Sequence, residues 1–107
     1  MKITLEQVRE ALRKDDFDYI NDQIGRLMDT AKGALLAEIG YKAGTAVPED
    51  KAEEFDKVSD NYIIEYVRAF LDQVDNERTR TILAVQLEGL LLPSDSSDDG
   101  GQGGDGQ

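Results

Sequence analysis

Apolar side chains recur at helical spacing along most of the chain, and the first such run is short. It consists of Leu5, Val8 and Leu12. Thr4 precedes the run, and Gln7 follows Thr4 by three residues. A Thr and a Gln at this spacing form a capping box, in which each side chain accepts a hydrogen bond from the other residue's backbone N–H. The pattern therefore predicts a first helix over residues 4–13.

A longer apolar stripe begins directly after Asp15 and Asp16, one of which we expect to cap the second helix. Placed at about 100° per residue, its members fall within an arc of about 120°. They are Phe17, Ile20, Ile24, Leu27, Met28, Ala31, Leu35 and Ile39. Gly40 follows, and glycine commonly ends helices in the left-handed conformation. The stripe predicts a long second helix over residues 16–39.

Two more helices are expected in the second half of the chain. Pro48 suits the first position of a helix, and the acidic residues after it suit the first turn. The apolar residues that follow keep one helical phase, which predicts a third helix over residues 49–74, with a break at 59–61 left open. Asp75 or Asn76 caps a fourth helix, which runs to Leu92 and ends at Pro93.

No stretch of useful length alternates as a strand would, so the predicted fold is all-α. We expect a small bundle of about four helices over residues 1–93, with a short first helix and a long second helix. The last segment, SDSSDDGGQGGDGQ, has a Gly/Ser/Asp composition that cannot build a core. We therefore expect a disordered, flexible C-terminal segment over residues 94–107.

The expected fourth helix is apolar in nearly every direction around its axis. Its apolar residues are Ile82, Leu83, Ala84, Val85, Leu87, Leu90, Leu91 and Leu92. A helix of this kind is usually buried on more than one side, and a chain of 107 residues has little interior to offer. Two interpretations stay open: a central helix in a compact bundle, or a helix with one side against a neighbouring subunit.

The second interpretation gives a set of candidate subunit-interface residues. In the fourth helix they are Val85, Leu87, Leu90, Leu91 and Leu92. In the second helix they are Gly25, Gly33 and Leu36, because glycines that flank a leucine would let a partner helix approach closely. The alternative for the two glycines is that they are tolerated at the surface.

The formal net charge is −11. Residues 94–107 hold four aspartates and no basic residue, which leaves −7 on residues 1–93. The basic residues of the body are scattered, whereas binding to phosphates needs a basic stripe. The charge therefore disfavours binding to the phosphates of nucleic acid.

Candidate chemistry is sparse. The chain has no Cys and no His, which excludes thiol and imidazole catalysis and most zinc sites. The acidic group Asp15, Asp16 and Asp18 lacks the spacing of a calcium loop and is better explained by helix caps. Tyr62 and Tyr66, one helical turn apart, are more typical of a core than of base stacking. We expect no enzymatic activity, cofactor or metal, and no signal peptide or membrane contact.

The opening stretch, ITLEQVREALRKDDFDYINDQIGRLMDTAKGALLAEIG, resembles the N-terminal half of the small phage head–tail connector (adaptor, or head-completion) proteins. In that family a short capped helix, an acidic break and a long amphipathic helix open the chain. The segment SDNYIIEYVRAFLDQVDNE falls where the family places its next aromatic-rich helix. The resemblance is one of pattern, covers residues 1–76 and departs at RTRTILAVQLEGLLLP, where many members have a less regular end.

The resemblance implies a structural virion protein that is assembled in the host cytoplasm and located at the head–tail interface. Identical copies would form a ring, dodecameric like the portal, between the portal protein and the tail or stopper protein. Duplex DNA would pass through without specific binding during packaging and head completion. On this hypothesis, candidate contacts with the portal or tail are Pro93, Ser94, Asp95, Asp98 and Asp99.

A second hypothesis is a small acidic regulatory module that inhibits a basic partner by mimicking the charge of DNA. It uses the charge of −11 but leaves the apolar fourth helix unexplained. Portal and tail genes beside the gene would favour the connector, and regulatory or restriction-evasion genes would favour the inhibitor.

Overall fold

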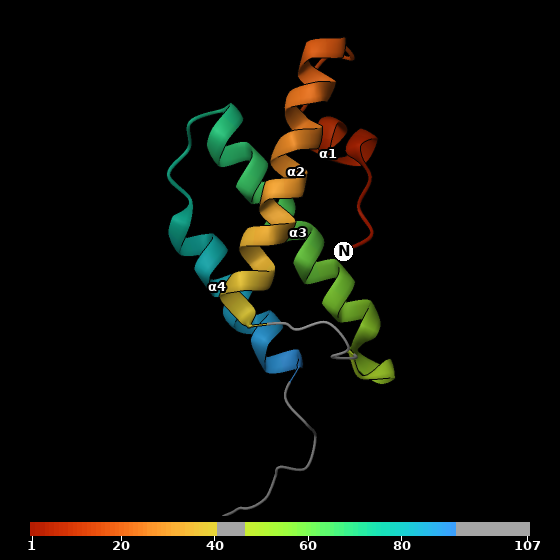
Figure 1. Cartoon of the computed structure of the whole chain (residues 1–107), viewed down its shortest axis with the longest axis vertical. Coiled ribbons are helices and arrows are strands. Elements are labelled where there is room, and N and C mark those ends of the chain that lie inside the picture. Colours follow the sequence, from red (N-terminus) through yellow and green to blue (C-terminus); the bar gives the residue numbers. More distant parts are fainter. Residues whose placement is uncertain (41–46, 92–107) are drawn as a thin grey trace, which may run out of the picture.

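A computed structural model of the chain describes residues 1–40 and 47–91 and confirms the all-α fold (Figure 1). Within these residues there is no strand. The helices are α1 (Leu5–Ala11), α2 (Asp18–Ile39), the short 3₁₀ helix η1 (Glu49–Lys51), α3 (Ala52–Leu71) and α4 (Glu77–Leu90). The short first helix and the long second helix are as predicted. The expected flexible segment 94–107 lies outside the described residues.

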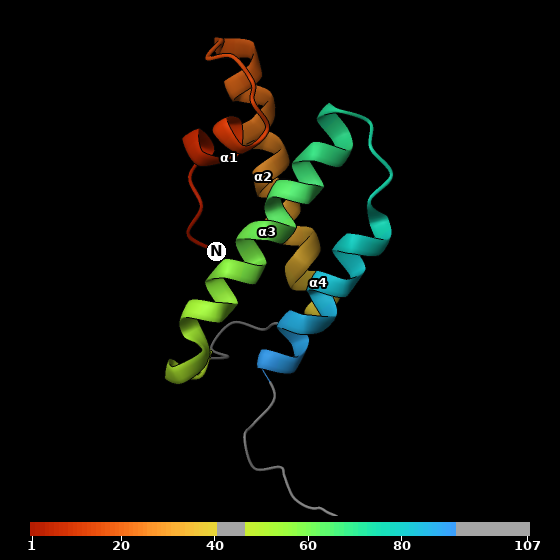
Figure 2. The same cartoon turned by 180° about the vertical axis from the view of Figure 1, so that it is seen from behind.

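Helix α3 is the centre of the arrangement. It crosses α2 in the opposite direction and packs along α4, while α1 lies against α2 near the end where α2 begins (Figures 1 and 2). Helix α4 also contacts α2. None of the helices in the described part of the chain is both long and apolar enough to cross a membrane.

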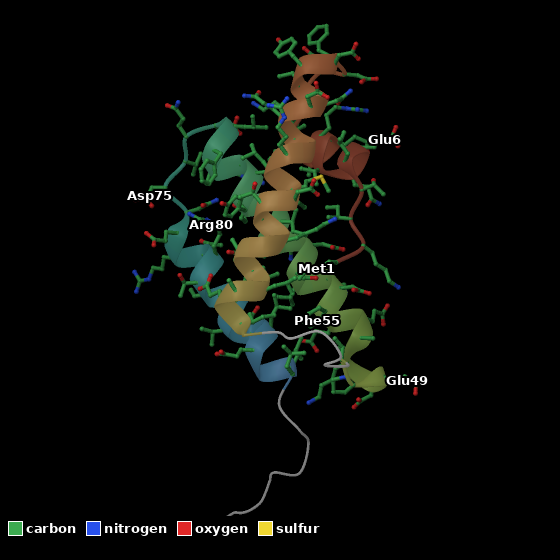
Figure 3. The ribbon with its side chains drawn as sticks, viewed as in Figure 1. Met1, Glu6, Glu49, Phe55, Asp75 and Arg80 are labelled. Carbon is green, nitrogen blue, oxygen red and sulfur yellow. The ribbon has the colours of Figure 1, made fainter. Side chains whose placement is uncertain are left out.

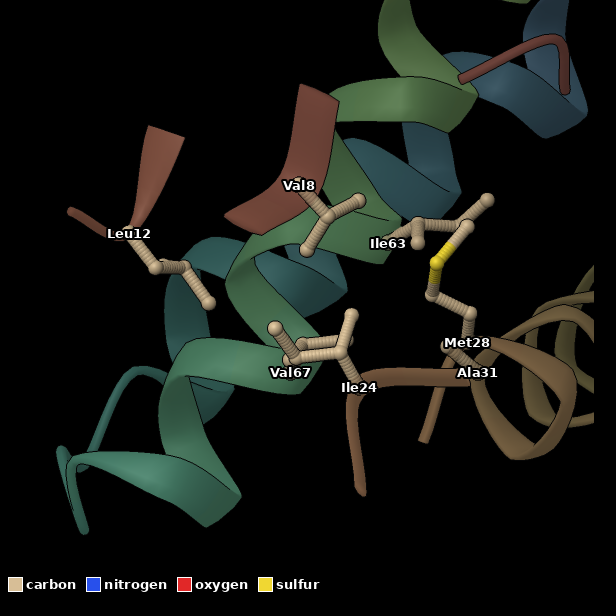
Figure 4. Packing of buried hydrophobic residues seen from close by; sticks show 7 residues of the cluster. All are labelled: Val8, Leu12, Ile24, Met28, Ala31, Ile63 and Val67. Atoms are coloured by element: carbon tan, nitrogen blue, oxygen red, sulfur yellow. The ribbon is translucent and has the colours of Figure 1, made fainter. Parts of the chain in front are cut away.

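The core consists of two hydrophobic clusters that meet on α3. The first joins α1, α2 and α3 and consists of Val8, Leu12, Ile24, Met28, Ala31, Ile63 and Val67 (Figure 4). The second joins α2, α3 and α4 and consists of Leu35, Ile39, Phe55, Tyr62, Ala84 and Leu87. The short α1 thus belongs to the core, since Val8 is fully buried.

The start of α1 follows the prediction. The Gln7 backbone N–H donates to Thr4 Oγ1 at 3.2 Å, and the Thr4 backbone N–H donates to Gln7 Oε1 at 2.9 Å. The helix ends earlier than predicted, because Leu12 is its C-cap and Arg13 has a left-handed φ of 57°.

The predicted start of α2 was wrong. Its N-cap residue is Phe17, and neither Asp15 nor Asp16 caps it. Asp16 instead accepts hydrogen bonds from Asn21 Nδ2 at 2.8 Å and from Arg9 Nη1 at 3.3 Å, so it ties the connection to α1. The predicted end is confirmed, because Gly40 is the C-cap with a φ of 66°.

Helix α3 is unbroken at residues 59–61, where a break had been left open. Ser59 is fully buried, and its hydroxyl donates to the Asp56 backbone carbonyl at 3.1 Å, so the helix accommodates it without distortion. The helix ends at Leu71, three residues earlier than predicted, and Gln73 then takes a left-handed φ of 54°. The α-helix also begins later than predicted. Residues Glu49–Lys51 form η1, with Pro48 as its N-cap, and α3 begins at Ala52.

The N-terminal residues before α1 are fixed to α3. The Met1 ammonium donates to Asp56 Oδ1 at 2.7 Å, and the backbone N–H groups of Lys2 and Ile3 donate to Asp60 Oδ1 at 2.9 and 3.1 Å. The ammonium's hydrogen bond holds the pKa of Asp56 below its ordinary value.

Candidate subunit interface

One side of α4 packs on the chain's own core. Ala84 and Leu87 are buried in the second cluster, and Leu83, Leu90 and Leu91 are half-buried against it. These five residues account for most of the apolar character that the sequence gives to α4. The hypothesis of a wholly central helix is wrong, because only this one side of α4 is buried.

The opposite side of α4 is apolar and exposed, and we call it the outer face of α4: Ile82, Val85 and Gly89. Ile82 is 53% exposed and Val85 is 60% exposed. At about 100° per residue, Ile82 and Val85 lie about 140° and about 160° from Leu87 around the helix axis. Within residues 1–40 and 47–91, and apart from the adjacent residues and the backbone of α4 itself, no atom lies within 4 Å of the position that a Cβ would take at Gly89. The outer face thus presents two branched apolar side chains beside bare backbone.

The predicted interface residues of α4 therefore separate into groups. Val85 is exposed and can reach a neighbouring subunit, while Leu90 and Leu91 are half-buried at the edge of the second cluster. Leu87 was wrongly assigned to an interface, because its side chain is fully buried within the protein. Leu92 lies outside the described residues.

The three predicted interface residues of α2 do not form one surface. Gly25 faces α1: a Cβ placed there would lie 3.5 Å from Leu5 Cδ1, so the helix it admits belongs to the same chain. The assignment of Gly25 to a subunit interface was therefore wrong. Gly33 is exposed in open space, as the surface alternative predicted, and Leu36 is half-buried.

A polar cluster fixes the start of α4 against α3. Asn76 Nδ2 donates to the backbone carbonyl of Glu65 at 2.8 Å and to Glu65 Oε1 at 2.9 Å. Arg80, which Figure 3 labels near the beginning of α4, donates from Nε to Asn76 Oδ1 at 2.9 Å. Asn76 was predicted to cap α4, and it occupies the N-cap position, but its side chain makes no capping hydrogen bond. It instead sets the angle at which α4 leaves α3.

The aromatic residues of α3 form a stack that continues from the core to the surface. The ring centroids of Tyr62 and Tyr66 are 6.3 Å apart, and those of Tyr66 and Phe70 are 4.9 Å apart. Tyr62 is 2% exposed, which confirms its core assignment. The guanidinium carbon of Arg80 lies 5.4 Å from the centroid of Tyr66, so a cation covers this half-buried ring.

A second exposed apolar surface was missed by the sequence analysis, and we call it the aromatic tip: Phe17 and Tyr19. Their rings stack with centroids 5.9 Å apart and planes 5° apart. Phe17 is 51% exposed and Tyr19 is 67% exposed. Phe17 was predicted to face the core, and that prediction was wrong because α2 begins after it. The sequence feature that could have indicated this exposure is the group of aspartates directly around Phe17 and Tyr19.

Two aspartates form ion pairs with basic residues that precede the aromatic tip in the sequence, and these pairs stabilise the fold. Arg9 pairs with Asp16, and Lys14 pairs with Asp72 at the end of α3. Among residues 1–40 and 47–91, no group of three or more His, Cys, Asp or Glu side chains is arranged to hold a metal ion.

The predicted contacts with the portal or tail, Pro93 to Asp99, lie outside the described residues. Compared with protein-family models, curated proteins and solved structures, the chain gives no match.

Proposed function

We propose that this chain is a structural subunit of a phage head–tail connector, which forms a homo-oligomeric ring between the portal protein and the tail or stopper. The observation that carries the proposal is the outer face of α4. A helix that already packs its other side on the core exposes Ile82 and Val85 by more than half. The sequence resemblance over residues 1–76 supports the same proposal.

The outer face favours association because it leaves apolar surface in water. Full burial of a Val or Ile side chain is worth about 1.5–3 kcal/mol, so two half-exposed residues stand to gain about 1 kcal/mol each. The polar cluster around Asn76 holds α4 in place, so a partner would meet an ordered surface. Contacts between two different patches on identical copies close into rings where the rotation permits.

The charge of the chain agrees with a channel through which DNA passes. At −11, the protein repels the phosphate backbone, and a wall that repels DNA does not retain it. This observation also favours the second candidate, an acidic inhibitor of a basic protein. The inhibitor hypothesis gives no role to the outer face of α4, so we rank it second.

Native mass spectrometry and electron microscopy test the connector proposal. We expect full-length protein to form rings alone or on a phage portal protein. Val85→Asp should reduce assembly at least tenfold, because it places a charge in the interface. The matched control is Thr30→Asp, which adds the same charge at an exposed position of α2. A protein that stays monomeric even with portal present would contradict the proposal.

A further inference from the structure

We propose that the aromatic tip of one copy packs on the outer face of α4 of a second copy. The inference rests on the proposed function and names the two surfaces that meet in the ring. A ring needs two different patches, because a patch that pairs with itself produces a closed two-fold dimer. The outer face supplies one patch, and the aromatic tip is the second.

The two surfaces match in apolar character. The tip offers Phe17 and Tyr19, and the outer face offers Ile82 and Val85, all more than half exposed. A shallow hollow beside Tyr19 is lined by Asp22, Gln23 and Arg26. A branched side chain that projects from a helix can enter such a hollow, and the bare backbone at Gly89 leaves room for a ring.

The two surfaces also match in charge. From Asp15 to Asp22 the chain carries four aspartates and no lysine or arginine. One of them, Asp16, is paired with Arg9. On α4, Arg78 is in line with the outer face, about 180° from Leu87 around the axis, and the acidic Glu88 lies at its edge, about 100° from Leu87. Opposite charge around an apolar contact fixes its register and disfavours pairing of each surface with itself.

A different exposed pair, Phe70 and Val74, is the main competitor for the second patch. They are 55% and 44% exposed. Phe70 and Phe17 each stack on a tyrosine and are similarly exposed, but Val74 is less exposed than Tyr19, which is 67% exposed. Asp72 beside it is paired with Lys14, so its charge is already matched within the chain. The aromatic tip is the more exposed pair, and beside it Asp15 and Asp18 form no ion pair among the described residues, so we assign the contact to the tip.

The contact is small, which predicts how it behaves. A stable interface buries about 800 Å² on each partner, more than two or three side chains supply. We therefore expect weak association in free solution and strong association where many copies are held side by side on a portal.

Cysteine cross-linking tests the inference, because the natural chain has no cysteine. Full-length Tyr19→Cys, labelled with ¹⁵N, is mixed with unlabelled Val85→Cys and joined by a short bismaleimide, both free and on the portal. Mass spectrometry separates mixed from same-variant products. We expect mixed products to exceed the background several-fold. The background is set by Glu54→Cys, an exposed site at the start of α3, mixed with Val85→Cys.

A charge exchange supplies the second measurement. Arg78→Glu in the Val85→Cys protein should lower the mixed yield several-fold, and Asp22→Lys in the Tyr19→Cys protein should restore it. Three results would each overturn the inference. Mixed products could be no greater than background, Val85→Cys could be joined mainly to itself, or Val85→Cys could be joined to Val74→Cys in place of Tyr19→Cys. If rings still form and Val85→Asp still prevents them, only this inference fails. If no assembly forms with any protein, the proposed function fails too.

Discussion

Tyr62 places a phenol almost out of contact with water, among residues of α2 and α4. It is 2% exposed, and its hydroxyl donates to Glu38 Oε1 across a long 3.4 Å. Burial raises the pKa of Tyr62 above its ordinary value of 10.0, and the negative charge of Glu38 acts in the same direction. Both effects disfavour the phenolate in the folded protein, since a charged group loses hydration when it is buried.

The raised pKa of Tyr62 makes stability depend on alkaline pH. The contribution of the neutral phenol is fully present below pH 10.0 and is lost as pH rises through the folded-state pKa. We expect Tyr62→Phe to unfold in urea much like the natural protein at pH 7, because the hydrogen bond it removes is long. Above pH 10 the variant should lose less stability than the natural protein.

The control for this measurement is Tyr19→Phe, which removes a tyrosine that is 67% exposed. Its stability should follow the natural protein across the alkaline range. Parallel pH curves for the natural protein and Tyr62→Phe would show that Tyr62 does not titrate differently in the folded state.

At the scale of the element, the sequence is most informative where a helix end depends on neighbouring residues alone. Thr4 and Gln7 cap α1 through each other, and Gly40 ends α2 through its own backbone. The predicted start of α2 was wrong: Asp16 does not cap the helix but accepts hydrogen bonds from Arg9 of α1 and from Asn21 of α2. Asn76 similarly bonds Glu65 of α3. Such partners are known only after the helices pack.

The residues of the candidate interface also depend on how the helices pack, which the sequence pattern does not give. Helical spacing gives the angle between Val85 and Leu87 but does not say which of them faces α3. Only the packed helices show that Leu87 fills the core and that Val85 is exposed. Phe17 could not be placed because its exposure depends on where α2 begins, and in the folded chain Phe17 is the extended N-cap residue of α2.

The capping box gives a prediction for α1. Thr4→Ala removes the hydroxyl that accepts the Gln7 backbone N–H, and loss of such a cap costs about 1 kcal/mol. Because Val8 and Leu12 of α1 are buried in the first cluster, this cost should lower the free energy of unfolding of the protein in urea. Thr30→Ala, at an exposed position of α2, should leave stability unchanged or slightly raised. Equal effects of the two changes would contradict the role of the cap.

At the scale of the whole molecule, charge governs encounters with other molecules. A net charge of −11 on a chain of 107 residues repels polyanions over about one Debye length, about 10 Å at 0.1 M salt. In the proposed ring this charge is repeated in every subunit. The wall would then resist adhesion of DNA, while the apolar part of each contact between subunits is little affected by salt.

We therefore expect no shift of a duplex DNA fragment by the protein, alone or assembled, even at low salt where electrostatic binding is strongest. A gel-shift assay at micromolar protein measures this. A Lys-substituted variant such as Asp22→Lys together with Asp29→Lys, both exposed on α2, serves as a comparison with reduced repulsion. Micromolar binding by the natural protein would contradict the expectation.

The position of α3 between the two hydrophobic clusters also sets an order of amide hydrogen exchange. Ile63 and Val67 of α3 belong to the first cluster, and Phe55 and Tyr62 belong to the second. Helix α1 contributes only to the first cluster and α4 only to the second, so each can open without the other. Amides in the middle of α3 should then exchange only when the whole protein unfolds. A partner that binds α4 would slow exchange in α4 and leave the opening of α1 unchanged.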